Sequence, residues 1–519
     1  MLFHYKSLES YVDSDWDEPS FWREESTFRS KPWRGQDGPI RTVPAGPSID
    51  PVAPLFVQSA INTDGVGLSE TKGFNDPSPG KRIGAGYYEF NIREGIRDSV
   101  AEAFLGTRFS DRPIFPDNLE IRTGATVLRV LTNSESAIAG GGKPRAIGVE
   151  YTNEDGHVNK VMLKDTAGSD TSKSQIILAA GAIMTPQLLV NSGIGPHGNV
   201  KDLPGVGENL QDHPVVAMSF RLTSNMTRKS SSIYTLGDEM EDYLISVAEL
   251  MSLKATATNH SSSSKQRMSR MLHARIGTLG TPGFAAGAFL RSPWSDDEAP
   301  DLQLTVFPRV VEPHVTRKER QDEVNFQRNN CMLVTVALLR PDARYSINFA
   351  KTKDLTDLVS SKSENFVSST SQTNEISNRN PVASFHLPSI EIPGNSNEYL
   401  SNSDVRRLSW GMEQVRRVMH TAPLSLHTQG EVYPGEDQDL EKYVRHNHLP
   451  NSHWVGSTKM GPDHDQMAVL DESLRVRGVD SLRVVDAGAI PTVPNGNTHS
   501  TVCVMADRAV DFMVSERSR

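Results

Sequence analysis

The chain has 519 residues, of which 37% are hydrophobic and 23% charged, and its formal net charge is -10. One hydrophobic core stops growing near roughly 250–300 residues, so we expect two lobes. The acidic balance excludes nucleic acid as an expected partner, because such binders concentrate positive charge. No apolar run reaches the about 18 residues of a membrane span, and no secretory leader follows Met1, so we expect no membrane partner and a cytoplasmic location.

The first part of the chain predicts mixed α/β structure. Residues 1–90 are rich in Pro, Gly, Asp, Trp and Arg without periodicity, which predicts extended loops. Apolar positions at helical spacing predict a helix from Glu94 to Leu105. Strand patterns follow over 119–122, 125–131 and the two hairpin arms 145–151 and 158–163.

A strand-to-helix junction comes next. The apolar run 175–181 predicts a buried strand that leads into a helix over 185–192, with Gly181 at the turn, Thr185 as N-cap and Pro186 at the first helical position. Such a junction points backbone N–H groups at a phosphate or cofactor edge. The same junction also serves packing alone in many α/β proteins, so this segment by itself leaves both interpretations open.

Beyond Pro214 the character of the sequence changes to Ser/Thr-rich stretches between regular elements. The periodicity predicts an amphipathic helix over 236–251, strands over 302–307 and 332–339, a Ser/Asn-rich loop over 351–379 and a helix over 403–419. The two cysteines, Cys331 and Cys503, are too few for a disulfide framework or a four-cysteine zinc site. Both lie in apolar runs and are expected to be buried.

The last seventy residues carry the strongest functional signal. His453 lies in Asn451-Ser-His-Trp-Val-Gly-Ser-Thr-Lys-Met-Gly-Pro462, and His499 lies in Asn495-Gly-Asn-Thr-His-Ser-Thr501, 46 positions later. Small residues flank both histidines and would let a flat ligand approach the backbone. A helix is predicted to begin at His499, with Asn497 or Thr498 as its N-cap.

Four blocks in this order resemble the glucose-methanol-choline oxidoreductases: residues 181–196, residues 202–214 and the two C-terminal histidine blocks. The resemblance implies an α/β, two-lobed flavoprotein with a discontinuous FAD-binding lobe and an α+β substrate lobe of sheet and helices. It implies that 1–214 belong to the flavin-binding region, 215–445 to the substrate lobe, and 446–519 to a return into the flavin lobe.

The same resemblance implies roles for individual residues. His453 would be the general base of an alcohol oxidation, and His499 would orient the substrate oxygen. Asp486 would anchor its loop. The implied contacts with FAD are made by Val127, Ala487, Asn497 and Thr498.

The family's N-terminal βαβ unit, whose Gly-x-Gly-x-x-Gly turn holds the FAD pyrophosphate, is not recognised in this sequence. Gly84-Ala-Gly86, Gly140-Gly-Gly142 and Gly205-Val-Gly207 lack both the spacing and the strand-turn-helix context. The sequence therefore suggests a chain truncated at its N-terminus.

The leading hypothesis is an FAD-dependent oxidoreductase that oxidises a primary or secondary alcohol, aromatic alcohols included, as its small-molecule substrate. The alternatives are a non-catalytic homologue unable to hold FAD, and a flavin-containing lyase. The spacing of His446, His448 and His453 fits no zinc pattern, so we expect no metal site. Sequence alone leaves the oligomeric state and the electron acceptor open.

Overall fold

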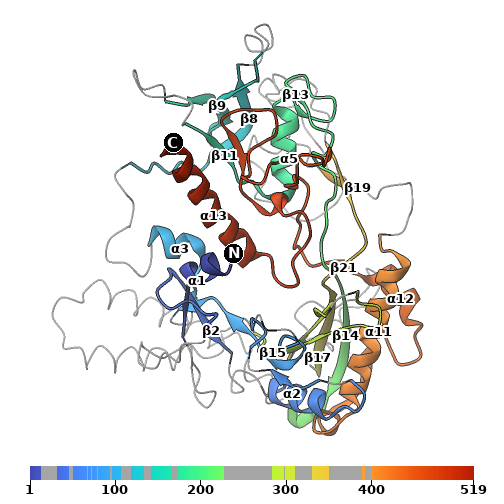
Figure 1. Cartoon of the computed structure of the whole chain (residues 1–519). Coiled ribbons are helices and arrows are strands. Elements are labelled where there is room, and N and C mark those ends of the chain that lie inside the picture. Colours follow the sequence, from blue (N-terminus) through green and yellow to red (C-terminus); the bar gives the residue numbers. More distant parts are fainter. Residues whose placement is uncertain are drawn as a thin grey trace, which may run out of the picture. The chain divides into compact units, whose positions relative to one another are not determined.

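The computed structural model describes residues 1–12, 32–45, 51–106 (except 67, 72, 77, 79, 94 and 95), 118–133, 142–164, 174–226, 283–309 (except 297), 330–349, 388–391 and 399–518. The chain divides into two compact units (Figure 1). Unit 1 comprises Met1–Leu119, His213–Asp342 and Leu400–Asn451, and unit 2 comprises Glu120–Asp212, Ala343–Tyr399 and Ser452–Arg519. The helix expected over 236–251 and the loop expected over 351–379 lie outside the described residues.

The division into units differs from the three stretches expected from the sequence. The chain changes unit after Leu119, Asp212, Asp342, Tyr399 and Asn451. Residues 1–119, however, belong to the same unit as 213–342. The assignment of 1–214, 215–445 and 446–519 to flavin and substrate binding stays a prediction.

Unit 1 is built on an eight-stranded sheet. Its strand order is β20-β14-β17-β16-β15-β4-β3, with β21 also paired to β14. All of its pairings are antiparallel except that of β3 with β4. The strands are β3 (Glu70–Thr71), β4 (Gly84–Tyr87), β14 (Pro214–Leu222), β15 (Ala286–Leu290), β16 (Leu302–Phe307), β17 (Cys331–Leu338), β20 (Thr428–Tyr433) and β21 (Leu449–Pro450).

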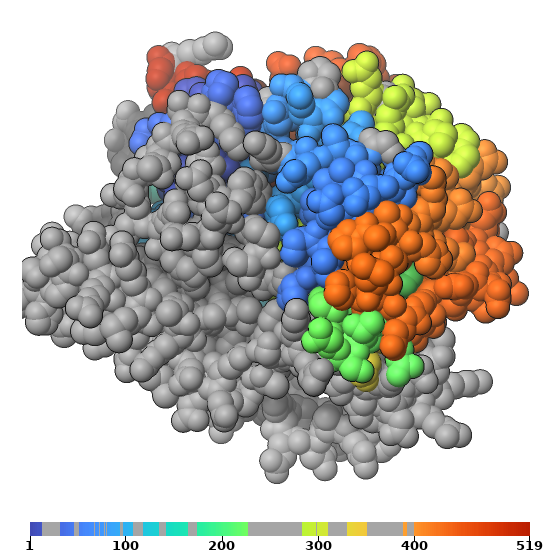
Figure 2. Space-filling model, turned by 90° about the horizontal axis from the view of Figure 1, so that it is seen from below, coloured from blue at the N-terminus to red at the C-terminus, as the bar shows by residue number. Residues whose placement is uncertain are grey.

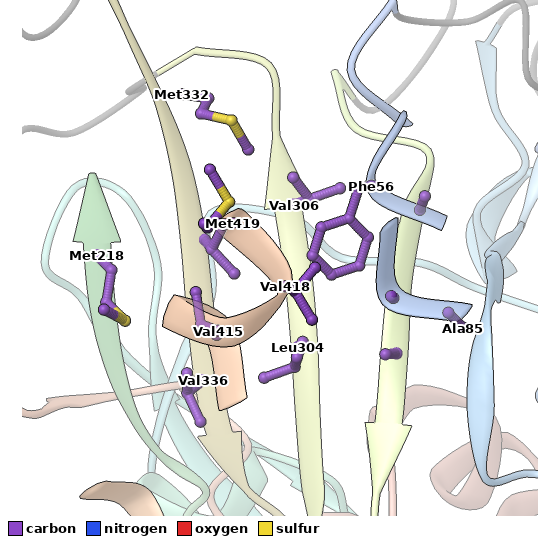
Figure 3. Close-up of a cluster of buried hydrophobic side chains, with 14 of the residues drawn as sticks. Phe56, Ala85, Met218, Leu304, Val306, Met332, Val336, Val415, Val418 and Met419 are labelled. Atoms are coloured by element: carbon purple, nitrogen blue, oxygen red, sulfur yellow. The ribbon is translucent and has the colours of Figure 1, made fainter. Parts of the chain in front are cut away.

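Helices α2 (Ala53–Asn62) and α11 (Asn402–Met419) pack on one face of this sheet. Alternation selects the residues of that face: Leu302, Leu304 and Val306 of β16 are fully buried, whereas the residues between them are only half-buried. Figure 3 shows Val415, Val418 and Met419 of α11 beside Leu304, Val306 and Val336 of the strands. The strand predicted over 302–307 is confirmed, and that over 332–339 is confirmed one residue earlier.

Helix α11 begins at Asn402, one residue before the predicted start. Ser401 and Asp404 form a reciprocal capping box, which supplies partners for backbone groups at the first turn. Gly411 permits close packing, since a Cβ at this position would lie 2.7 Å from Val336 Cγ1. The prediction of a helix over 403–419 is confirmed.

Segments far apart in sequence join at the far end of α11. Ser59 Oγ donates to Thr421 O at 3.0 Å and accepts from Leu424 N at 2.8 Å. Figure 2 shows the corresponding surface, where a blue segment from the region of α2 adjoins an orange segment from the region of α11 and the residues that follow it. The polar bonds therefore fix α2 to the turn before β20.

The prediction of extended loops over residues 1–90 is wrong. That stretch contains helix α2 and strand β4, both buried in the core of unit 1. In α2 the buried residues Ala53, Phe56, Val57 and Ala60 lie at helical spacing, but a helix of ten residues is too short to be stable without tertiary packing. The helix expected over 94–105 is shorter than predicted, since α3 is Val100–Leu105, and residues 119–122 form no strand.

The remaining elements of unit 1 are short. They are α1 (Leu2–Leu8), β1 (Glu9–Tyr11), β2 (Ile40–Pro44), β5 (Glu89–Phe90), β6 (Ile92–Arg93), β7 (Ile96–Arg97), a 3-10 turn at Leu424–Leu426 and α12 (Leu440–Asn447).

Both cysteines were expected to be buried. Cys331 is buried in β17, whereas Cys503 of unit 2 is only half-buried.

Unit 2 combines an antiparallel meander with a two-stranded parallel sheet. The meander joins β8 (Thr126–Thr132), β9 (Ala146–Thr152) and β10 (Val158–Met162), which confirms the predicted hairpin. The parallel pair joins β11 (Ile176–Leu178) to β22 (Leu482–Val484), about three hundred residues later. Other elements are α5 (Gly181–Asn191), β12 (Ile194–Gly195), β13 (Lys201–Asp202), β18 (Ser346–Asn348), β19 (Ser389–Glu391), the 3-10 turn η7 (Ala487–Ala489) and α13 (His499–Arg517).

Leu408→Ala tests the role of α11 in the core of unit 1. Leu408 is fully buried in the sheet-helix core, so truncation should lower the free energy of unfolding by about 2–5 kcal/mol. The exposed Glu413→Ala on the same helix should change it by less than about 0.5 kcal/mol. Equal midpoints of urea denaturation for the two variants would contradict this packing.

Candidate active site

Asp212 fixes the backbone around His453. Its buried carboxylate accepts the N–H of Ser452 at 3.1 Å and the N–H of His453 at 2.6 Å. Ser452 has a φ of 59°, in the left-handed region that costs energy for a residue other than glycine. The carboxylate therefore holds a turn that the chain would not adopt alone, and His453 leaves that turn in a defined direction.

The His453 ring contacts the segment that precedes α13. Its Nε2 lies 3.3 Å from Asn497 Nδ2. An amide NH₂ group only donates, so Nε2 accepts this bond and carries the lone pair. Burial lowers the pKa of His453 from its ordinary value of 6.5. The ring is therefore neutral, and basic at Nε2, at neutral pH.

His499 is the first residue of α13, as the sequence predicts, and it is exposed. Its Nε2 lies 3.8 Å from Cys503 Sγ, one helical turn later. The i,i+4 spacing of these two residues could have indicated the contact from the sequence. Thr498 is the N-cap but makes no side-chain capping bond, and the first turn holds no acidic residue. No side chain of the helix itself neutralises the positive end of its dipole.

Asp486 ties two distant segments together, and the prediction that it anchors its loop is confirmed. Its carboxylate accepts Gly181 N–H at 3.0 Å, Thr185 Oγ1–H at 2.6 Å and Gly488 N–H at 2.8 Å. Burial raises the pKa of Asp486, and these donors oppose that rise. The carboxylate thus joins the start of α5 to the η7 turn.

The position predicted for the start of α5 is wrong. The helix begins at Gly181 with Ala180 as N-cap, so Thr185 lies in its second turn and Pro186 inside it. Thr185 Oγ1 instead accepts Ala180 N–H at 3.0 Å and donates to Asp486. The polar residue expected to cap the helix is used in a tertiary bond.

Ala487 lies beside the His453 segment. Gly456 N–H donates to Ala487 O at 3.4 Å, and Thr458 N–H donates to Gly488 O at 2.9 Å. Val127 lies in β8, opposite Tyr151 of β9, in the meander and not in the histidine-bearing segments. The structure therefore brings His453, Asn497 and Ala487 into neighbouring segments and leaves Val127 in a separate element.

One string has the literal Gly-x-Gly-x-x-Gly spacing, Gly193-Ile-Gly-Pro-His-Gly198, but it follows the C-terminal end of α5. Its backbone forms the β12–β13 turn, where His197 N–H donates to Asp202 at 2.9 Å. Phosphate binding by this motif requires the glycines to precede a helix N-terminus. The string is therefore not a dinucleotide-binding turn.

Among the residues that the structure describes, no three His, Cys, Asp or Glu side chains are grouped to hold a metal ion. Within the same residues, none of the helices has both the length and the apolar character of a membrane span.

Two family models match the chain. The N-terminal GMC oxidoreductase model matches residues 22–215, and the C-terminal GMC oxidoreductase model matches residues 373–506. Together they span more than half of the 519 residues. The chain belongs to the GMC oxidoreductase family.

Relatives within the family differ in the reactions for which they are named. The chain is 26% identical over 501 residues to an oxygen-dependent choline dehydrogenase of Vibrio vulnificus, over 93% of this chain and 71% of that protein. It is 26% identical over 504 residues to a chloroplastic fatty acid photodecarboxylase of Chlamydomonas reinhardtii, over 93% and 69%. A formate oxidase of Aspergillus oryzae aligns with a TM-score of 0.65 at 19% identity, over 100% of this chain and 78% of that one.

FAD is the cofactor of this family of oxidoreductases. Three features of the GMC chain fit the group. Thr458 Oγ1 is buried beside Gly488 with no hydrogen-bond partner among the described residues. The N-terminus of α13 has no side-chain cap. At Gly181, with a φ of 84°, a Cβ would meet no atom within 4 Å.

Asp486→Ala tests the tie between α5 and η7. The substitution leaves three donors without their acceptor, so the free energy of unfolding should fall by about 2–5 kcal/mol. Asp480→Ala, on an exposed side chain of the same unit, should change it by less than about 0.5 kcal/mol. A thermal midpoint of Asp486→Ala equal to that of Asp480→Ala would contradict the tie.

Proposed function

We propose that this GMC oxidoreductase oxidises a primary or secondary alcohol with FAD, and that His453 takes the hydroxyl proton. The observation that carries the proposal is the state of His453: a half-buried, neutral imidazole whose Nε2 accepts from Asn497 and whose backbone is fixed by Asp212. A general base needs both a defined position and a free base form near neutral pH.

FAD, when bound, supplies the acceptor for the hydride that leaves the carbinol carbon. His453 holds the hydroxyl proton at Nε2, so the alcohol loses one proton and one hydride and becomes a carbonyl compound. The substrate hydroxyl replaces or shares the bond that Asn497 makes to that nitrogen.

His499 and its neighbours orient the reactants in this proposal. His499 would donate a hydrogen bond to the substrate oxygen, while Cys503 lies near its Nε2. Asn497, Thr498 and the backbone of Ala487 would contact the flavin, with the positive end of α13 favouring negative charge on it. Val127 is the proposed contact on the adenine side.

His453→Gln tests the proposed base. Glutamine keeps an amide of similar reach but cannot take a proton, so the rate of flavin reduction by an alcohol should fall by about 10²–10⁴-fold. The measurement is anaerobic single-turnover absorbance of bound FAD, with choline and an aromatic alcohol as first substrates. FAD content should stay unchanged.

His446→Gln is the matched control, because His446 lies on α12 with its Nδ1 at 2.7 Å from Lys442 O. The FAD bound to the His446→Gln variant should be reduced by alcohol at the same rate as in the unsubstituted protein. A His453→Gln variant with unchanged rates contradicts the proposed base. FAD binding without reduction by any alcohol favours a lyase, and a protein indifferent to FAD favours a non-catalytic homologue.

The rate should also depend on pH through His453. Its pKa is lowered from 6.5 by burial, so the base form is complete at neutral pH and is lost as pH falls through that lowered value. We expect kcat/KM, measured between pH about 5 and 8, to decline on the acid side with an apparent pKa below 6.5. An acid limb above 6.5 would contradict this environment for the ring.

The free energy of unfolding should also fall as the pH falls. Since the unfolded chain binds the proton at higher pH than the folded chain, protonation of His453 favours unfolding. This destabilisation is absent above pH 6.5 and grows as the pH falls below 6.5.

A further inference from the structure

The segment Asn209–Asp212 contacts both histidine-bearing segments of unit 2. Gln211 forms an antiparallel bridge with Val455, with N–H···O distances of 2.9 Å in both directions. Directly after it, Asp212 accepts Ser452 N–H and His453 N–H. The segment therefore forms a backbone and side-chain clamp on the loop that carries His453.

The side chain of Gln211 reaches the other segment. It is fully buried, and its Nε2 donates to Pro491 O at 3.0 Å while its Oε1 accepts Val493 N–H at 3.2 Å. Both bonds lie on the stretch that leads to Asn497 and His499. One glutamine thus uses its donor and its acceptor on the same short piece of backbone, which fixes that backbone in register with the glutamine.

Asn209 adds a third connection between the same two segments. With a φ of 60°, it directs Nδ2 to Gly456 O at 3.3 Å and to Pro491 O at 3.2 Å. Gly456 has a φ of 94°, and a Cβ there would lie 2.4 Å from Asn209 O. Close approach of the two backbones at this point excludes every side chain larger than hydrogen.

We propose that Gln211 and Asp212 are positioning residues, which set the location of the His453 ring relative to the start of α13. The proposal deepens the proposed function and rests on it. Neither residue is required to touch substrate or flavin. Their buried polar groups act through the backbone of two loops that lack regular secondary structure and would otherwise have several arrangements.

Positioning predicts a particular pattern of kinetics. A displacement of a reacting group by about 1 Å can cost on the order of 100-fold in rate. Asp212→Asn replaces one carboxylate oxygen with an NH₂ that faces a backbone donor. It should lower the limiting rate of flavin reduction on the order of 10- to 100-fold, with the amount of bound FAD unchanged.

A double-mutant cycle distinguishes positioning from independent damage. If Asp212 acts through His453, Asp212→Asn added to His453→Gln should cause no further loss in the rate of flavin reduction. A double variant that loses the product of the two single effects overturns the proposal. Failure of His453→Gln alone to slow reduction overturns the proposed function instead, so the two failures are separable.

Asp202→Asn is the matched control. The Asp202 carboxylate likewise accepts the N–H of a residue with positive φ, His197 at 58°, but in the β12–β13 turn. The FAD bound to the Asp202→Asn variant should be reduced at the same rate as in the unsubstituted protein. Rates lowered equally in Asp202→Asn and Asp212→Asn overturn the specific role of Asp212.

A rescue variant covers the case in which Asp212→Asn folds poorly. Ser452→Gly removes the cost of φ at 59°. Combined with Asp212→Asn, it should restore the thermal midpoint and the FAD content while the rate stays low, because glycine leaves His453 less constrained. Recovery of the full rate together with the midpoint overturns the positioning role.

Gln211→Glu supplies an independent arm at the second connection. It keeps the shape of the side chain but sets a carboxylate oxygen against Pro491 O, so the stretch before α13 should shift. The expected result is a slower flavin reduction that is non-additive with a His499→Ala substitution. Strict additivity of these two losses overturns the role of Gln211.

Discussion

The candidate site depends on buried polar side chains that hydrogen-bond the backbone of loops. Asp212 and Asp486 each accept backbone N–H groups from loop residues, and Gln211 both donates to and accepts from a loop. A buried backbone group without a partner is costly, so these loops remain in the one arrangement that satisfies all of them. Regular secondary structure contributes little here: Ser452, His453 and Trp454 belong to neither a helix nor a strand.

Unit 1 follows a different physical principle. Its sheet buries alternate residues against α2 and α11, so the hydrophobic effect over a large apolar surface defines the arrangement. Polar side chains have a secondary role, as at Ser59, which joins α2 to the turn after α11. A scaffold of this kind tolerates variation on its surface. The loops of unit 2 depend on individual hydrogen bonds and should tolerate far less.

Periodic elements were predictable because their patterns are local. Strand β16 and helix α11 match the expected ranges closely, since alternation in the strand and apolar residues at helical spacing in the helix are both visible in short windows of sequence. Helix α2 was missed because ten residues in a Pro- and Gly-rich region form a helix only when packed on the sheet. Thr185 has the composition of an N-cap, but a carboxylate about three hundred positions away takes its hydroxyl.

The sequence by itself determined the family, the flavin chemistry that goes with it, and the two histidines as the residues to consider. These conclusions depend on residue identity and order, which are fully present in the chain. Only the tertiary structure decided that Asn497 lies next to His453 and that Asp212 supports the turn at Ser452. Such pairings join residues tens to hundreds of positions apart. They arise from the demand that buried donors find acceptors, and no local pattern in the sequence records which acceptor is chosen.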